Sequence, residues 1–264
     1  MLALTLNNIN LHYRDEGPVD GTPVLFINSL GTDFRLWDQI LPLLPEGLRL
    51  IRYDKRGHGL SSGPKAPYFM GDLVADAAAL LDALKVKQAI VVGLSIGGMI
   101  AQGLAAERPD LVRAAVLSNT GAKIATPAIW QERIEACRKG GVEALADGTM
   151  TRWFSPTFHR DRAAEMQLWR TMMTRTSLEG YLGCSAAIAE TDLYDSTARL
   201  RLPVLGIAGS ADGSTPPDLV RETTELVPGS QFELIHGAGH LPCVETPERY
   251  AGILRGFLQQ NGAA

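Results

Sequence analysis

A lone serine stands among glycines in the segment GLSIGG, where Ser95 is flanked two residues away by Gly93 and Gly97. The apolar run 88–93 predicts a strand, and the residues after the serine predict the start of a helix. A nucleophile at the tip of such a turn has a strained backbone, and small neighbours let the strand and the helix approach each other. The pattern therefore predicts a nucleophilic serine, with a glycine-rich turn that has no chemical role as the alternative.

Ile96, the first residue of the predicted helix, adds a second feature to this turn. Its backbone N–H would point at the same place as the Ser95 hydroxyl, and N–H groups at a helix start stabilise negative charge. The turn therefore predicts one donor of an oxyanion hole.

A serine hydroxyl is a weak nucleophile and needs a base. His240 lies between the last predicted strand and the last predicted helix, and it follows the serine in the chain, as the order serine, acid, histidine requires. His58 precedes the serine in a glycine-rich loop, and we expect it to be structural or to line the entrance. No supporting context surrounds His12, His159 and His236, which we interpret as surface or hydrogen-bonded histidines.

The acid should follow a core strand, and Asp212 follows the predicted strand 202–209. The preceding core strand, 112–119, is the other position where an acid could stand, but it ends in Asn119. Asp212 is therefore the better candidate for the group that orients the histidine.

Asp54 also follows a predicted strand, but it precedes Ser95 and adjoins Lys55 and Arg56. We expect an ion pair with these neighbours that pins the loop. The predicted catalytic triad thus consists of Ser95, Asp212 and His240.

The elements that must position these residues alternate between apolar strands and amphipathic helices, of which 72–84 and 247–259 are the clearest. A hairpin through Asn7 and Asn8 precedes them. This alternation predicts an α/β fold with a mainly parallel sheet covered on both faces. The later strands are predicted at 23–28, 48–54, 88–93, 112–119, 202–209 and 231–237.

Residues 121–199 break this alternation, because they contain no strong strand signal and read as several helices. We expect an all-helical lid over the carboxyl edge of the sheet, where open α/β folds bind ligands. The core domain would then comprise residues 1–120 and 200–264.

Composition limits the class of protein. The 264 residues, 45% of them hydrophobic, fit one large domain, and no apolar run is long enough to span a membrane. No signal peptide is evident, so we expect a cytoplasmic protein whose three cysteines are reduced.

The net charge of −4, without a basic face, argues against nucleic acid as a partner. No nucleotide, cofactor or metal motif is present in the sequence. The oligomeric state, a homo-oligomer included, stays open.

The segments YDKRGHGLS, GLSIGG, GSADGSTP and GAGHLPCVETPE resemble the signature segments of the α/β-hydrolase superfamily along the whole chain. The resemblance implies a mostly parallel eight-stranded sheet. Within the superfamily the chain is most similar to 3-oxoadipate enol-lactonases, through NSLGTDFRLWD, GAKIATPAIWQER, RWFSP and TSLEGYLGCSAAIAETDL. The last three segments lie in the lid, which varies most with substrate.

The segment NSLGT departs from most of the superfamily, which has His-Gly where this chain has Asn28 and Ser29. The lactonases are similar to this chain in that respect. The resemblance implies that the N–H of Leu30 is the second oxyanion donor and places Asn28 beside the substrate; a role for Asn28 in capping the loop is the alternative.

The resemblance implies hydrolysis of a five-membered enol-lactone to 3-oxoadipate during the catabolism of aromatic compounds, without a cofactor. The substrate's carboxylate needs a cation, and Arg133 shares a helix face with Trp130. Its stem could equally lie along the core, and Arg152 and Arg35 are alternatives. Trp130 and Trp153 are candidate contacts to the substrate, although Trp130 could belong to the core of the lid.

Other functions stay open. The same triad would serve another lactonase, a small-molecule esterase or a carbon–carbon bond hydrolase, whereas a dehalogenase would be expected to carry an aspartate at position 95. A receptor that binds a small ligand without catalysis is the alternative from another class of function.

Overall fold

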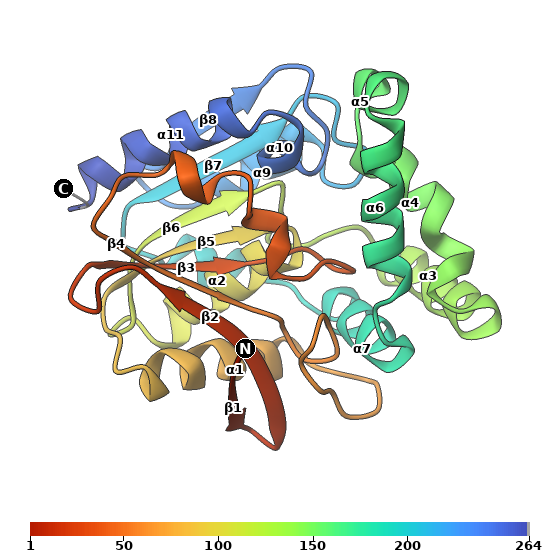
Figure 1. Cartoon of the computed structure of the whole chain (residues 1–264), viewed down its shortest axis with the longest axis horizontal. Helices are drawn as coiled ribbons and strands as arrows, with labels where there is room; N and C mark the ends of the chain where they lie inside the picture. Colours follow the sequence, from red (N-terminus) through yellow and green to blue (C-terminus); the bar gives the residue numbers. More distant parts are fainter. Residues whose placement is uncertain (263–264) are drawn as a thin grey trace.

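The computed structural model describes residues 1–262, and its strands form one eight-stranded sheet (Figure 1). The strands are β1 (Leu2–Leu6), β2 (Ile9–Glu16), β3 (Thr22–Ile27), β4 (Leu48–Tyr53), β5 (Ala89–Leu94), β6 (Val112–Ser118), β7 (Val204–Gly209) and β8 (Gln231–Ile235). Their order across the sheet is β1-β2-β4-β3-β5-β6-β7-β8.

β2 is antiparallel to both of its neighbours, and every pair from β4 to β8 is parallel. The hairpin between β1 and β2 turns through Asn7 and Asn8, whose φ angles of 49° and 62° suit a tight turn between twisted strands. The predicted fold class and hairpin are therefore confirmed.

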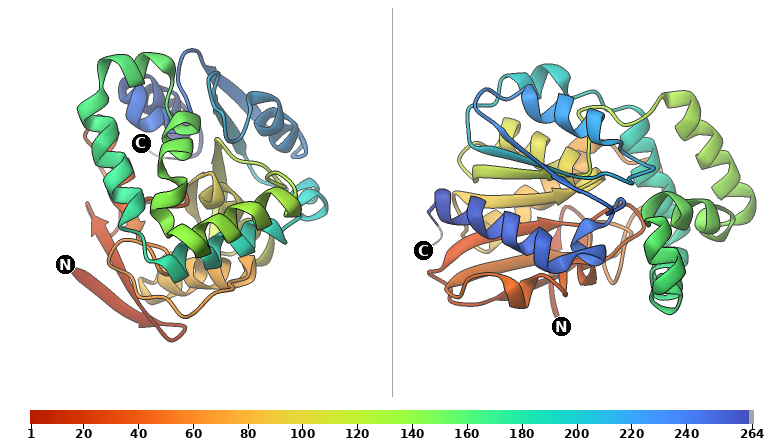
Figure 2. Two further views of the ribbon diagram at one scale, coloured as in Figure 1. Left: turned by 90° about the vertical axis from the view of Figure 1, so that its right-hand side faces the viewer. Right: turned by 90° about the horizontal axis from the view of Figure 1, so that it is seen from above.

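Helices cover both faces of the sheet. In Figure 1, α2 (Ile96–Glu107) and α9 (Pro217–Glu225) lie behind the sheet and α11 (Pro247–Gln260) lies in front of it, and the right-hand view of Figure 2 separates them. α1 (Met70–Ala83) packs against α2. The short elements η1 (Phe34–Trp37), η2 (Leu41–Leu43) and α10 (Pro242–Glu245) complete the core.

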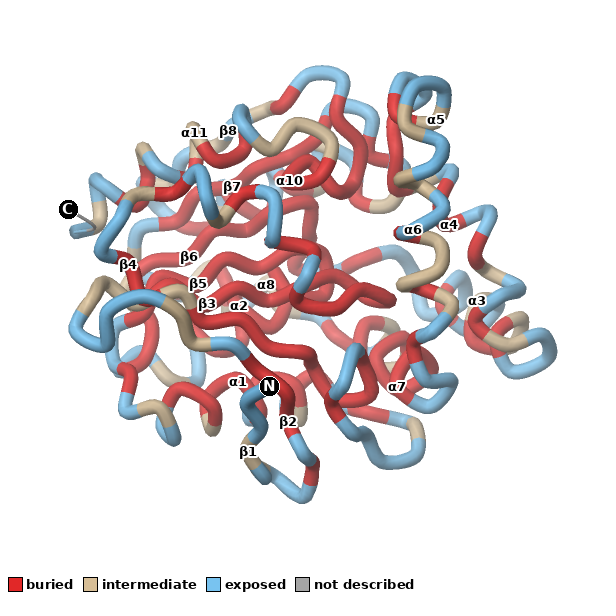
Figure 3. The backbone as a smooth tube through the Cα atoms, in the orientation of Figure 1, coloured by how far each residue is buried: buried red, intermediate tan, exposed pale blue. Residues whose placement is uncertain are grey.

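The central strands are buried on both faces. All six residues of β5 and all six of β7 are buried, and the tube in Figure 3 is continuously red there. This double burial explains why these strands read as apolar runs without alternation.

The chain between β6 and β7 is helical, and most of its helices, green to blue-green in Figures 1 and 2, lie beyond the carboxyl ends of the strands. The first of these helices begins at Pro127, with the Thr126 hydroxyl accepting a hydrogen bond from the N–H of Ile129. The last returns to the core, where Thr197 donates to Gln102 of α2. These elements are α3 (Pro127–Gly140), η3 (Val142–Leu145), α4 (Ala146–Trp153), α5 (Pro156–Asp161), α6 (Ala163–Thr174), α7 (Leu178–Ala189) and α8 (Tyr194–Ala198).

Two further predictions concern the whole chain. Cys137, Cys184 and Cys243 are free and buried. Within residues 1–262, no helix combines the length and apolar character needed to span a membrane.

Candidate active site

Ser95 lies at the junction of β5 and α2, with φ 60° and ψ −122°. A β-carbon on Gly93 would lie 2.2 Å from the carbonyl oxygen of Gly97, and one on Gly97 would lie 2.0 Å from that of Ile27 in β3. Both positions therefore require glycine for the close approach of backbone to backbone. The left-handed conformation of a non-glycine residue at this point is the strain expected of a nucleophile elbow.

The predicted acid and base are in direct contact. His240 Nδ1 lies 2.8 Å from Asp212 Oδ2, and both side chains are almost completely buried. Within residues 1–262 no protein group bonds to His240 Nε2, and His240 and Ser95 line the same pocket. The structure thus brings together the three residues of the predicted triad from three separate loops.

In addition to the hydrogen bond with His240, the carboxylate of Asp212 accepts hydrogen bonds from three other residues. Asn119 Nδ2 donates to Oδ2 at 2.9 Å, Thr215 Oγ1 donates to the same oxygen at 2.7 Å, and the N–H of Ser214 donates to Oδ1 at 2.7 Å. Burial alone would raise the pKa of Asp212, but the charge of His240 and the hydrogen bonds lower it below its ordinary value. The acid therefore stays ionised and fixed in orientation.

No role in the site was predicted from the sequence for Asn119 or Thr215, which both donate to Asp212. Asn119 follows β6, the other strand after which an acid could stand, and it donates a hydrogen bond to the carboxylate of Asp212 from there. Its position at the end of a core strand was the signal that could have indicated this.

A pocket opens between the sheet edge and the lid. It is lined by Ser29, Leu30, Ser95, Ile124, Ala125, Trp130, Arg133, Thr149, Trp153, Tyr181, Ile188, Ser214, Thr215 and His240. Apolar lid residues therefore face polar residues of the sheet edge across one space, which is the usual composition of a small-molecule site.

The two predicted oxyanion donors are the backbone N–H groups of Leu30, which lines the same pocket as Ser95, and of Ile96, which follows Ser95 in the chain. Ile96 begins α2, so its N–H has no partner within the helix. Among the described residues, neither N–H donates a hydrogen bond to another group. Both donors are therefore free to bind an oxyanion formed at Ser95.

A family model described as the alpha/beta hydrolase fold matches residues 22–141. The chain is 35% identical to 3-oxoadipate enol-lactonase 2 of Acinetobacter baylyi over 98% of its own length and 96% of that protein. The chain belongs to the α/β-hydrolase family. It is also 33% identical to 3-oxoadipate enol-lactonase 1 of the same organism, over 94% and 93% of the two chains. The crystal structure of the enol-lactonase from Burkholderia xenovorans LB400 superposes with a TM-score of 0.94 at 32% identity, covering 98% of this chain and all of that one.

Residues 28–32 of this α/β hydrolase, called the oxyanion loop after the predicted role of Leu30, are held by hydrogen bonds from side chains. The Asn28 side-chain amide donates to the Thr32 carbonyl, and Asn28 does not line the pocket. The structure therefore gives Asn28 the capping role instead of the substrate contact predicted first. His58 is structural, because its Nε2 accepts a hydrogen bond from the N–H of Gly31 at 3.1 Å.

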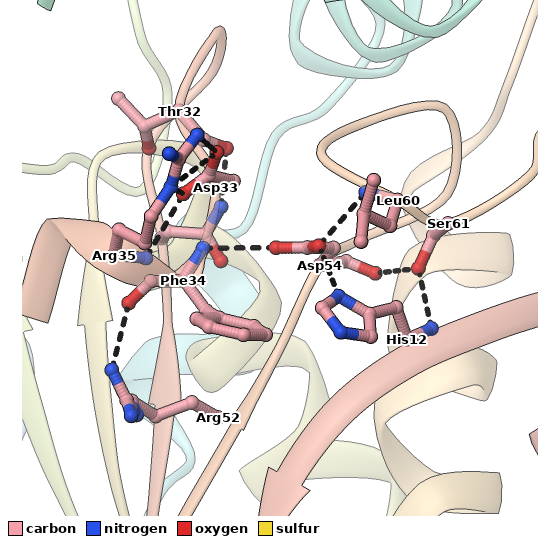
Figure 4. A network of polar contacts seen from close by, with 10 residues as sticks. His12, Thr32, Asp33, Phe34, Arg35, Arg52, Asp54, Leu60 and Ser61 are labelled. Atoms are coloured by element: carbon pink, nitrogen blue, oxygen red, sulfur yellow. Dashed lines mark hydrogen bonds and ion pairs between the residues drawn. The ribbon is translucent and has the colours of Figure 1, made fainter. Parts of the chain in front are cut away.

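The predicted ion pair of Asp54 with Lys55 and Arg56 is wrong. Asp54 Oδ2 lies 2.8 Å from His12 Nδ1, and its two oxygens also accept from the N–H groups of Phe34 and Leu60 (Figure 4). Asp54 still pins its loop, but it does so through groups distant in the sequence. Such partners leave no local signal in the sequence.

Arg56 forms its ion pair with Asp76 of α1 instead, with 2.6 Å between Arg56 Nε and Asp76 Oδ2. Arg35, an alternative for binding the substrate, is exposed and pairs with Asp33 at 2.6 Å (Figure 4). It does not line the pocket, so the structure removes it from the candidates.

Two arginines of the lid helices are left as candidates: Arg133 lines the pocket of this hydrolase, whereas Arg152 does not. The Arg133 guanidinium lies 4.6 Å from the ring centre of Trp130, and its buried Nε has no hydrogen-bond partner among the described residues. Arg152 donates to Thr149 at 3.1 Å, and burial together with the charge of Arg133 lowers its pKa. Within residues 1–262 neither arginine has an ion-pair partner, and both are half-buried. The charge of Arg133 therefore faces the pocket unbalanced, with Arg152 close to it outside the pocket lining.

Trp153 connects the lid of this hydrolase to its histidine loop. Its ring lies nearly parallel to that of His240, with 6.4 Å between the ring centroids. Its backbone carbonyl accepts a hydrogen bond from the backbone N–H of His240 at 2.7 Å. The Glu245 carboxylate fastens the same junction by accepting from the Ser155 hydroxyl and the Gly239 N–H. These contacts join the segment around Trp153 to the loop that carries His240. The role of Glu245 in joining them was not predicted from the sequence.

Proposed function

We propose that this hydrolase opens the ring of a five-membered enol-lactone that carries a carboxylate, giving 3-oxoadipate by way of an acyl-enzyme on Ser95. One observation carries the proposal: a single pocket contains the serine and histidine together with Arg133, whose charge no acid of the described chain balances. The names of the enol-lactonases with which the chain aligns nearly end to end support the choice of substrate.

In the first half of the reaction, His240 takes the proton of the Ser95 hydroxyl through Nε2, and the serine oxygen attacks the lactone carbonyl. The N–H groups of Leu30 and Ile96 bind the resulting oxyanion, each contributing about 3 kcal/mol to the transition state. Collapse of the intermediate breaks the ring C–O bond. The enolate that leaves is protonated and becomes the ketone of the product.

In the second half, His240 removes a proton from water, and the hydroxide attacks the ester on Ser95. Collapse of this intermediate releases the second carboxylate and restores the serine. Asp212 holds the imidazole through Nδ1 and stabilises its charged form in both steps.

Arg133 binds the carboxylate that the reaction leaves unchanged. A guanidinium fork matches a carboxylate, and the stacking on Trp130 fixes the plane of the fork. Arg152 adds a second positive charge close by. The site therefore prefers an anionic lactone to a neutral ester of the same size.

The test of this preference is Arg133→Ala, assayed on the carboxylated lactone and on a neutral aryl ester. Loss of a charged hydrogen bond should raise KM for the lactone roughly 10- to 100-fold and leave the ester nearly unchanged. Arg138→Ala is the matched control, because Arg138 lies on the same helix but is exposed and paired with Glu135. Equal losses on both substrates would refute the proposed carboxylate site.

A further inference from the structure

Lys55 is a buried cation outside the pocket, directly behind the oxyanion loop. Its Nζ donates to the carbonyl of Ser29 at 2.5 Å and lies 3.4 Å from that of Thr32, and the residue is 1% exposed. Among the described residues these carbonyls are its hydrogen-bond partners, and no ion pair balances the charge. Burying an ammonium group in this way is costly, and an apolar side chain of the same length would fill the space without that cost.

The position of this charge relates it to the chemistry. The Ser29 carbonyl belongs to the peptide unit whose other end is the N–H of Leu30, one of the two proposed oxyanion donors. In a trans peptide the C=O and the N–H point in opposite directions. A cation hydrogen-bonded to the carbonyl therefore polarises the unit so that its N–H becomes a stronger donor on the side of Ser95.

The next peptides of the loop are held as well. The N–H of Gly31 donates to His58, and the Thr32 carbonyl accepts from Asn28. The loop is thus fixed along its length by side chains, but Lys55 alone supplies a charge to the peptide that carries the donor.

We propose that Lys55 is a positioning residue for catalysis: its ammonium group fixes and strengthens the Leu30 N–H through the peptide that joins Ser29 to Leu30. The inference rests on the proposed function, because it requires an oxyanion at Ser95.

The surroundings of Lys55 allow its charge to be removed without a mutation. Burial lowers its pKa to about 8, although Cys184, Asp54 and Asp33 oppose the shift. Burial also raises the pKa of Cys184 to about 12. Burial and the charge of Lys55 hold the pKa of His58 well below its ordinary value, so Cys184 and His58 both stay neutral between pH 7 and 9.5.

Raising the pH through about 8 therefore converts the ammonium to an amine of the same shape that can still donate. The experiment measures kcat on the enol-lactone from pH 7 to 9.5, with Ser95→Ala as the blank for uncatalysed hydrolysis. Removing an oxyanion donor costs at least a hundredfold, so weakening one should lower wild-type kcat about tenfold over this range, with KM little changed.

In Lys55→Met, kcat should already be about tenfold lower at pH 7 and should not fall further up to pH 9.5. Lys87→Met is the matched control, since Lys87 is an exposed lysine paired with Asp110, and it should follow the wild type. If the methionine variant fails to fold, Lys55→Gln removes the charge and keeps a donor.

A kcat of the folded Lys55 variant that equals the wild-type value at pH 7, or that falls with pH as in the wild type, would overturn the inference. A wild-type kcat that is constant across pH 8 would do the same. Full turnover by Ser95→Ala would instead refute the proposed function, so the two failures are distinguishable.

Discussion

At the scale of single residues, the site depends on which polar groups have hydrogen-bond partners within the protein and which do not. Asp212 has both oxygens occupied by donors, whereas His240 Nε2 and the N–H groups of Leu30 and Ile96 have no partner among the described residues. The carboxylate that orients the histidine thus has all its hydrogen-bond partners, whereas the groups proposed to contact the substrate have none within the described protein. This division is what preorganisation of a catalytic site requires.

Asp212→Asn tests the orienting group. The amide of Asn119 would then face another amide, and the new side chain would favour the wrong imidazole tautomer, so we expect kcat to fall about 10⁴-fold with little change in fold. Steady-state turnover of the lactone measures this, with the exposed Asp218→Asn as control. A loss of less than tenfold would show that Asp212 is not the acid.

At the scale of elements, the geometry of Ser95 depends on how closely β5, α2 and β3 approach each other. Gly97 faces the carbonyl of Ile27 at the end of β3, and Ile27 is followed by the oxyanion loop. The elbow and that loop are therefore packed against each other through backbone atoms, and the sheet fixes the distance between Ser95 and the proposed oxyanion donors.

Gly97→Ala should disturb both stability and catalysis. The β-carbon would lie 2.0 Å from a backbone oxygen that has no room to yield, so we expect a loss of about 2 kcal/mol or more in the free energy of unfolding, together with reduced kcat. Gly252→Ala is the control, because a β-carbon there meets nothing within 4 Å; in helix α11 it should add about 0.5–1 kcal/mol. Urea unfolding of both variants measures the difference, and unchanged stability of Gly97→Ala would contradict the packing argument.

At the scale of the whole molecule, the sequence predicted what local patterns and chain order determine. The strands, the elbow at Ser95, the helical lid segment and the loops that bear Asp212 and His240 follow from periodicity and turn chemistry. It did not predict the partners of Asp54 or Arg35, or the capping by Asn28, because these depend on which loops meet at the sheet edge. Nor could it show that Arg133 and Arg152 lack acid partners, which is a property of the assembled lid.

The most direct measurement is the initial rate at which 3-oxoadipate enol-lactone disappears, followed by ultraviolet absorbance, for the wild type and Ser95→Ala side by side. We predict rapid turnover by the wild type and a loss of at least about a thousandfold in the variant, because removing a serine nucleophile abolishes the acyl-enzyme route. No turnover by a wild-type protein whose Ser95 still reacts with a serine-directed phosphonate would contradict the lactonase assignment. Undiminished turnover by Ser95→Ala would contradict the catalytic role of the serine.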